Sequence, residues 1–210
     1  MKKILFLIAF LVISTSSLFA QEAYLMFGGT MSNMLYDSKR ISNPLIGGIY
    51  GVKAWLGIDT DKATSTFSTG IIFVQNKWNI NMMDFPNQNN TDENYKIKIT
   101  YLQIPLSFPI FDLYTSYNDG DFFINIGCYY GRAINSKCKN GDFKIFGNEP
   151  NDLNLKKNDF GLQIAATSLN EAFDFSIVCQ YGLVNILKNS DKQLHNFAVL
   201  LNIAYNPFWF

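Results

Sequence analysis

The sequence predicts an all-β protein, an eight-stranded antiparallel up-and-down barrel that spans a membrane. The first observation is the stretch Lys96–Ile110, whose even positions are apolar from Leu102 to Ile110 while its odd positions are mostly polar. Successive side chains of a strand point to opposite faces, so this stretch has one apolar and one polar face. The apolar band covers about the ~9–11 residues that a tilted strand needs to cross hydrocarbon. An N-terminal export signal and the lack of any later long apolar run are the other two observations.

Met1–Ala20 is the export signal. Two lysines precede the apolar run Ile4–Ile13, and small residues lead towards Ala20, as in a secretory signal peptide. We expect cleavage after Ala20, which makes residues 1–20 the signal peptide and residues 21–210 the outer-membrane barrel domain. The run is shorter than the ~20 residues of a spanning helix. With no other long apolar run, a mature chain in a membrane must be a closed barrel.

The composition agrees with a protein that is partly in lipid. The 210 residues carry no formal net charge, and 16% are charged against 16% aromatic. This charged fraction is below the ~25% of typical soluble domains. Balanced charge gives no electrostatic reason to expect a nucleic acid, so we expect outer-membrane lipid as a partner and no nucleic acid.

The first three of eight predicted strands are less regular than the later ones. The second strand places glycines, Lys53 and Trp55 on one face and apolar residues on the other. The third strand has no clear face, because Ile71, Ile72, Phe73 and Val74 are all apolar. The eight predicted strands are Tyr24–Met31, Leu45–Ile58, Phe67–Trp78, Lys96–Ile110, Asp121–Ile134, Asn158–Thr167, Phe173–Ile186 and His195–Tyr205.

The later strands alternate consistently, with apolar residues on one face and small or polar residues on the other. We expect the apolar face to contact lipid and the polar face to line the lumen. The lipid-facing residues are Leu102, Ile104, Leu106, Phe108, Ile124, Ile126, Leu162, Ile164, Phe175, Ile177, Val199, Leu201 and Ile203, and the lumen residues are Lys53, Gln103, Asn125, Gln163, Gln180 and Asn202. Side chains just fill an eight-stranded barrel, so we predict a hydrogen-bonded plug and not a pore.

The predicted connections alternate between long and short. The long ones are polar and are Ser32–Pro44, Asn79–Asn94, Asn135–Lys157 and Leu187–Leu194. Long extracellular loops and short periplasmic turns are the outer-membrane pattern, and this pattern places both termini in the periplasm. The loop Asn135–Lys157 contains Phe143, Ile145 and Phe146, which form the candidate contact patch. The alternative is that these residues only pack over the barrel mouth.

Several stretches resemble the PorT-like family of outer-membrane β-barrel domain proteins of Gram-negative bacteria. They are GGTMSNM, ITYLQIPLSF, FFINIGCYYGRAINSK, DFGLQIAA and FDFSIVCQYGLVNI, followed by an alternating last strand. The resemblance implies an eight-stranded barrel in the cell envelope and, from the founding group, a link to protein secretion. Apolar Ile71 and Phe73, and Pro207 near the C-terminus, depart from the family pattern. The last strand therefore either ends before Pro207 or contains a bulge.

The chemistry-bearing residues do not form a known motif. His195 is the only histidine, close to Ser190 and Asp191, and no nucleophile motif accompanies it. The outward positions of Cys128 and Cys179, on strands that are not neighbours, put them about 10 Å apart, beyond disulfide reach. We therefore predict free thiols, Cys138 in a loop among them. The sequence predicts no catalytic residue, no cofactor and no metal site.

We expect a non-enzymatic integral outer-membrane protein that acts as a monomeric barrel. Its predicted role is a surface-binding or envelope and secretion-accessory scaffold that works through extracellular loops, with envelope or secretion-machinery proteins as partners. One alternative is a soluble secreted or periplasmic barrel that carries a ligand, which requires the apolar face to point inward. Another is an outer-membrane lipid-modifying enzyme that uses His195.

Overall fold

The computed structural model describes residues 20–37, 39–60, 63–81, 94–114, 120–140, 144–147, 152–170, 172–188 and 193–207. Nearly all of the expected signal peptide lies outside these residues, as do Phe143, Ser190 and Asp191. Among the described residues no helix is long and apolar enough to cross a membrane.

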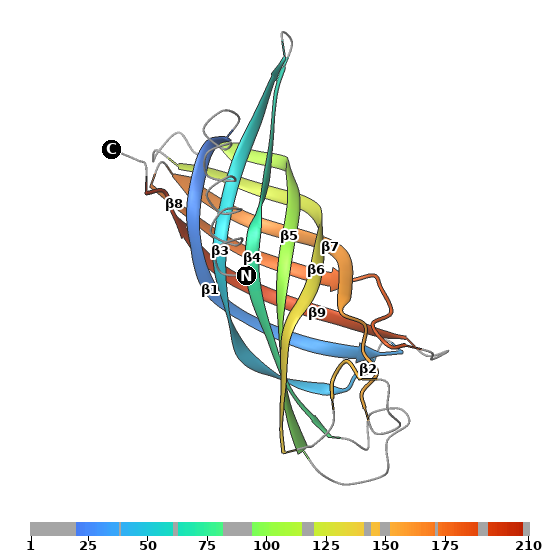
Figure 1. The fold of residues 1–210 in the computed structure, drawn as a ribbon. Helices are drawn as coiled ribbons and strands as arrows, with labels where there is room; N and C mark the ends of the chain where they lie inside the picture. Colours follow the sequence, from blue (N-terminus) through green and yellow to red (C-terminus); the bar gives the residue numbers. More distant parts are fainter. Residues whose placement is uncertain are drawn as a thin grey trace.

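The chain folds into one antiparallel sheet that closes on itself (Figure 1). Its strands are β1 (Ala20–Tyr36), β2 (Lys39–Arg40), β3 (Ser42–Thr60), β4 (Ala63–Asn81), β5 (Asn94–Tyr114), β6 (Gly120–Lys139), β7 (Asn158–Asn170), β8 (Phe173–Gly182) and β9 (Leu194–Tyr205). β2 is two residues that pair with the end of β1. The remaining strands pair in sequence order, and β1 pairs with β9. The predicted eight-stranded up-and-down barrel is confirmed.

Closure depends on a long register between the first and last strands. β1 and β9 pair from Leu25↔Tyr205 to Tyr36↔Leu194 without a register shift. Both the start of β1 and the end of β9 therefore lie at one end of the barrel. β9 ends at Tyr205, before Pro207, so the last strand ends early and does not continue through a bulge.

Most strands are longer than the sequence pattern predicts, and several predicted loops are correspondingly shorter. β5 has 21 residues and β6 has 20, roughly twice the ~9–11 residues that cross hydrocarbon. Most of the predicted loop Ser32–Pro44 is strand, with a tight turn at Asp37, whose φ is 44°. Cys138, predicted in a loop, pairs with Ile97 in the sheet. β8 is the exception, since it ends at Gly182 and not at Ile186. Backbone pairing continues beyond the apolar band because hydrogen bonds between strands need no apolar side chains.

The apolar faces of the strands form the outer wall of the barrel. Of the thirteen predicted lipid-facing residues, nine are exposed and Leu102, Leu106, Ile124 and Val199 are half-buried. Aromatic pairs lie at two levels of this outer wall. The rings of Tyr50 and Phe73 stack with centroids 4.9 Å apart at the level further from the termini. The ring centroids of Phe67 and Phe108 lie 5.9 Å apart at the level nearer the termini. Two aromatic girdles around an apolar belt are typical of outer-membrane barrels.

The interior is more apolar than the sequence analysis predicts. One cluster of buried apolar residues, around Tyr24, Trp55 and Leu200, lies towards the termini. A larger cluster, around Trp78, Ile97 and Leu194, lies towards the opposite end. The ambiguous third predicted strand explains part of this difference, because Ile72 and Val74 point inward while Ile71 and Phe73 point outward. Apolar and polar side chains therefore share the lumen, and Met26, Ile72 and Leu200 of the first cluster lie beside its polar residues.

Close approach between strands requires glycine at specific inner positions. A Cβ on Gly127 would lie 1.9 Å from the carbonyl oxygen of Leu106, and one on Gly51 would lie 2.3 Å from that of Ile71. Contacts this short exclude any side chain without a shift of backbone. Glycine at such sites lets strands bend tightly enough to close a narrow barrel.

Arginine in place of Ile126 tests whether the outer wall contacts lipid. Ile126 is the middle outward residue of β6, between Phe122 and Tyr130. We expect I126R to lower the free energy of unfolding by about 2–4 kcal/mol in vesicles, because a cation is costly at the bilayer midplane. The matched control is Ile134→Arg, which is equally exposed but lies beyond the girdle. It should cost about 0–1 kcal/mol. Equal losses in denaturant titrations of the two variants would contradict lipid contact at Ile126.

Candidate functional site: a filled lumen beneath an ordered cap

A buried ion pair crosses the lumen between β3 and β8. Lys53 Nζ lies 2.6 Å from Asp174 Oδ2, and the Asp174 side chain is fully buried. Trp55 Nε1 donates to the same carboxylate oxygen at 3.0 Å, and Ser176 Oγ donates to Oδ1 at 2.5 Å. The Lys53 ammonium also lies 4.9 Å from the centre of the Trp55 ring. These contacts compensate the carboxylate for the water that it loses on burial.

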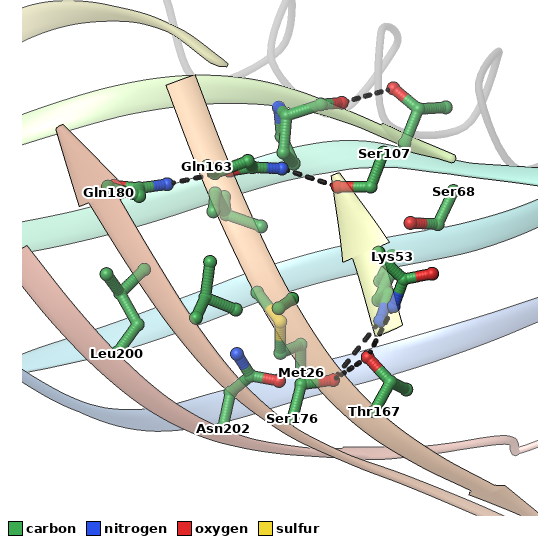
Figure 2. Close-up of a pocket in the computed structure, with 16 residues that line it drawn as sticks. Met26, Lys53, Ser68, Ser107, Gln163, Thr167, Ser176, Gln180, Leu200 and Asn202 are labelled. Carbon is green, nitrogen blue, oxygen red and sulfur yellow. Dashed lines mark hydrogen bonds between the residues drawn. The ribbon is translucent and has the colours of Figure 1, made fainter. Parts of the chain in front are cut away.

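Neutral amides continue this polar layer across β5, β7 and β8. Gln180 Nε2 donates to Gln163 Oε1 at 3.0 Å and to Gln103 Oε1 at 3.3 Å. Gln163 Nε2 donates in turn to Ser107 Oγ at 2.6 Å (Figure 2). Asn125 Nδ2 donates to Thr167 Oγ1 at 3.0 Å, and that hydroxyl lies 3.2 Å from Ser176 Oγ. Asn125 is therefore joined to the ion pair through the hydroxyl groups of Thr167 and Ser176, while the glutamines and Ser107 form a separate chain of hydrogen bonds.

The space left inside this layer is small. The cavity between the amides and the ion pair has a volume of about 40 Å³. A buried water needs roughly 10–15 Å³ by this measure, so the cavity has room for about three waters. An interior filled to this degree holds the walls of the barrel together and leaves little space for a solute.

The predicted lumen residues all lie on the inner face. Gln103, Asn125, Gln163, Gln180 and Asn202 are buried, and the Lys53 side chain is 13% exposed. This arrangement does not fit a soluble ligand-carrying barrel, which requires the apolar face to point inward. Asp174 and Trp55 have inward parity in the sequence, but their contacts with Lys53 could not be predicted from it, because pairing across the lumen depends on the curvature of the barrel.

A second buried polar group, which was not predicted from the sequence, lies nearer the end of the barrel that is opposite the termini. Asp159 Oδ2 accepts hydrogen bonds from Asn196 Nδ2 at 2.8 Å and from the Tyr129 hydroxyl at 3.1 Å. Asn196 Nδ2 also donates to the Tyr101 hydroxyl at 3.4 Å. All four residues are nearly fully buried. Their inner parity was readable from the sequence, but their convergence from four strands was not.

An ordered cap closes the end of the barrel that is opposite the termini. We define the cap as the described residues of the β6–β7 and β8–β9 connections, 144–147, 152–157 and 183–188. Ile145, Leu153, Leu155, Ile186 and Leu187 are buried against the inner apolar cluster. The two connections are joined by a bridge between Leu155 and Leu187 and by the bond from Lys156 N to Ile186 O at 2.7 Å.

The cap corrects the prediction of an exposed contact patch at Phe143, Ile145 and Phe146. Ile145 is only 3% exposed, and Phe146 is half-buried against the same cluster, while Phe143 lies outside the described residues. Burial over the barrel mouth removes these apolar side chains from water. The alternative in which they pack over the mouth therefore holds for Ile145 and Phe146.

His195 lies at the start of β9 and partly faces solvent. Its Nε2 lies 3.1 Å from Gln193 Oε1, and its ring stacks on Tyr181 at 5.7 Å. Within the described part of the chain no serine, threonine or cysteine bonds to this ring. The expected neighbours Ser190 and Asp191 lie outside that part, so the described contacts give the histidine a rim position and no nucleophile.

The three cysteines are free and half-buried. Cys128 on β6 and Cys179 on β8 keep β7 between them, as the sequence analysis expected. Cys138 lies in β6 and packs against the inner cluster beneath the cap. In the described ranges no three His, Cys, Asp or Glu side chains gather where they could hold a metal ion.

A closed antiparallel barrel with an apolar belt, aromatic girdles and a filled lumen defines the class of integral outer-membrane barrels. Residues 19–188 match the family described as "Outer membrane protein beta-barrel domain". The chain belongs to this family, and its location is therefore the outer membrane. No curated protein shows significant sequence similarity to the chain.

Among solved structures the chain is similar to Ail, the attachment invasion locus protein of Yersinia pestis. The structure of Ail with the heparin analogue sucrose octasulfate has 14% sequence identity and a TM-score of 0.43. A second Ail structure has the same identity and a TM-score of 0.38. Each match covers 88% of this chain and 97% of Ail.

Removal of the Asp174 charge tests whether the ion pair holds the lumen together. We expect Asp174→Asn to lower the free energy of unfolding by about 3–5 kcal/mol, since it leaves a mostly buried ammonium unpaired. The double variant K53M/D174N should lose much less than the sum of K53M and D174N. A double-mutant cycle by urea titration in vesicles measures this coupling. Additive losses would show that the two side chains do not interact.

Proposed function

We propose that the protein is a non-enzymatic outer-membrane scaffold that binds its partner with the outer surface of the cap. The single observation that carries this proposal is the order of the cap itself. Lys144 N bonds to Asp152 Oδ1 at 2.8 Å, and Leu155 N bonds to Ile145 O at 3.0 Å. Asn185 Oδ1 accepts from the backbone N–H groups of Leu187 and Leu194. A surface that is ordered before binding loses less entropy when a partner docks.

The position of the cap supports the same proposal. With both termini in the periplasm, as the outer-membrane pattern predicts, the cap lies at the cell surface. Its buried leucines attach it to the barrel, and Lys156 is one of its exposed residues. Loops on a rigid scaffold are where binding is usually found. The resemblance to PorT-like proteins supports an envelope protein, such as a secretion component, as the partner.

Photo-crosslinking in intact cells tests the cap as the binding surface. A photoreactive residue at Lys156, on the cap, should give a defined adduct that mass spectrometry identifies. The matched probe at Phe173, an exposed residue at the opposite end, should not give that adduct. The same adduct from Phe173, or none from Lys156, would contradict the proposal.

A variant with a weakened cap tests whether binding needs the ordered conformation of the cap or only the exposure of Lys156. Leu155 is fully buried within the cap, and Leu155→Ala should weaken its local packing by about 2–5 kcal/mol. We expect the Lys156 adduct to fall severalfold while the thermal midpoint of the barrel changes little, because cap opening is local. The control is Leu200→Ala, in the other inner cluster, which should lower the thermal midpoint and spare the adduct. An adduct that persists in L155A would show that cap order is not needed for binding.

A further inference from the structure

We propose that five lysines on the outer wall, above the aromatic girdle, bind the phosphate groups of outer-leaflet lipids. We call them the lysine rows, and their arrangement follows from the strand register. Lys77 on β4 is opposite Lys98 on β5, and Lys98 is opposite Lys137 on β6. In the next row, Lys96 on β5 is opposite Lys139 on β6. The proposal concerns the side wall and does not depend on the function of the cap.

The side chains of the lysine rows point away from the lumen. Their strand neighbours Trp78, Ile97 and Ile99 are buried in the inner cluster, so alternation places the lysines on the opposite face. Lys96, Lys137 and Lys139 are exposed, and Lys77 and Lys98 are half-buried. Residues that are directly opposite in a sheet have Cβ atoms about 5 Å apart, so one row sets three cations across about 10 Å.

This arrangement is unfavourable unless an anion is present. Like charges that are directly opposite on neighbouring strands destabilise a sheet. In the described residues a salt bridge joins Lys53 to Asp174, and none involves a lysine of the rows. Phosphate groups are negatively charged and can pair with these ammonium groups. Several lysines around one phosphate strengthen its binding.

The height of the row formed by Lys77, Lys98 and Lys137 matches a lipid headgroup, and the row formed by Lys96 and Lys139 lies two residues further out along β5 and β6. Lys98 is four residues beyond Leu102, the last apolar residue of β5 on this face, and thus about 13 Å further along the strand. A strand tilt of about 35–45° reduces this to a height of about 10 Å. The headgroup layer of a leaflet is about 5–8 Å thick, and a lysine stem reaches down far enough to place its ammonium there.

The face of the barrel on which the lysine rows lie favours a lipid over a soluble polyanion as the ligand. The rows continue the same outward face as Leu102 and Ile104, which lie in the apolar belt. A lipid whose chains pack on that belt brings its headgroup to the lysines without further rearrangement. A soluble anionic polymer would approach from the cap end and would be excluded from this wall by the surrounding leaflet.

Lipid titration of the full mature chain, refolded in detergent micelles, tests this proposal. The probes are bisphosphorylated lipid A and the same lipid after enzymatic removal of its phosphates, with native mass spectrometry as the readout. We expect wild type to prefer the phosphorylated lipid at least tenfold, with weaker binding at higher salt. The variant K98Q/K137Q should lose about thirtyfold in affinity for that lipid, from two lost surface cations.

Matched variants keep the test decisive. K39Q/K156Q removes the same charge from exposed lysines at the same end of the barrel but outside the rows, and should change affinity less than twofold. K77Q/K139Q is a second variant within the rows, in case K98Q/K137Q fails to refold, and should behave as K98Q/K137Q does. Equal binding of the two lipids, or equal losses in the row and control variants, would overturn the proposal. So would loss of binding to a heparin fragment in K98Q/K137Q with lipid affinity unchanged, since that result assigns the rows to a soluble polyanion.

Discussion

The pairing of β1 with β9 is the constraint on which the rest of the structure depends. This register satisfies the backbone groups of two strands that would otherwise be exposed edges, and in hydrocarbon unpaired backbone groups are not tolerated. Closure also means that the side chain of each strand residue points either into the lumen or outward. Once the register is set, the apolar parity forms a continuous outer belt, and the other parity converges on a narrow lumen.

The narrow lumen explains the two kinds of inner packing. At the level of the Lys53–Asp174 pair, side chains from distant strands are close enough to bond directly. Nearer the cap, the walls are joined by large apolar residues such as Trp78, and the cap adds Leu153 and Leu155 from outside the sheet. Polar cross-links and apolar packing thus occur side by side along the barrel, as Trp55 beside Asp174 and Tyr101 beside Asn196 show. In the described part of the chain, the result is a filled support that leaves its outer wall and its ends available for contact.

The sequence was sufficient to predict the number of strands and the faces of the later strands, because lipid and lumen impose opposite chemistry on alternate residues. It was not sufficient where that contrast is lost. Ile71–Val74 are apolar on both faces, since the inner cluster there is as apolar as the outer belt. Strand ends such as that of β6, which includes Cys138, extend beyond lipid and carry no parity signal. The burial of Ile145 depends on a cap whose residues come from two separate connections.

The most direct test of the account is the environment of the outer wall at native positions. Cys128 and Cys179 lie on outward faces within the apolar belt, so a nitroxide can be attached to each in a chain in which Cys138 is replaced by Ala. Power-saturation electron paramagnetic resonance in vesicles then compares collisions with lipid-soluble oxygen and with a water-soluble nickel complex. If the apolar wall contacts lipid, collisions with oxygen dominate strongly at both positions. Dominance of the nickel complex at both positions would show that the apolar wall faces water, and would contradict a membrane-spanning barrel.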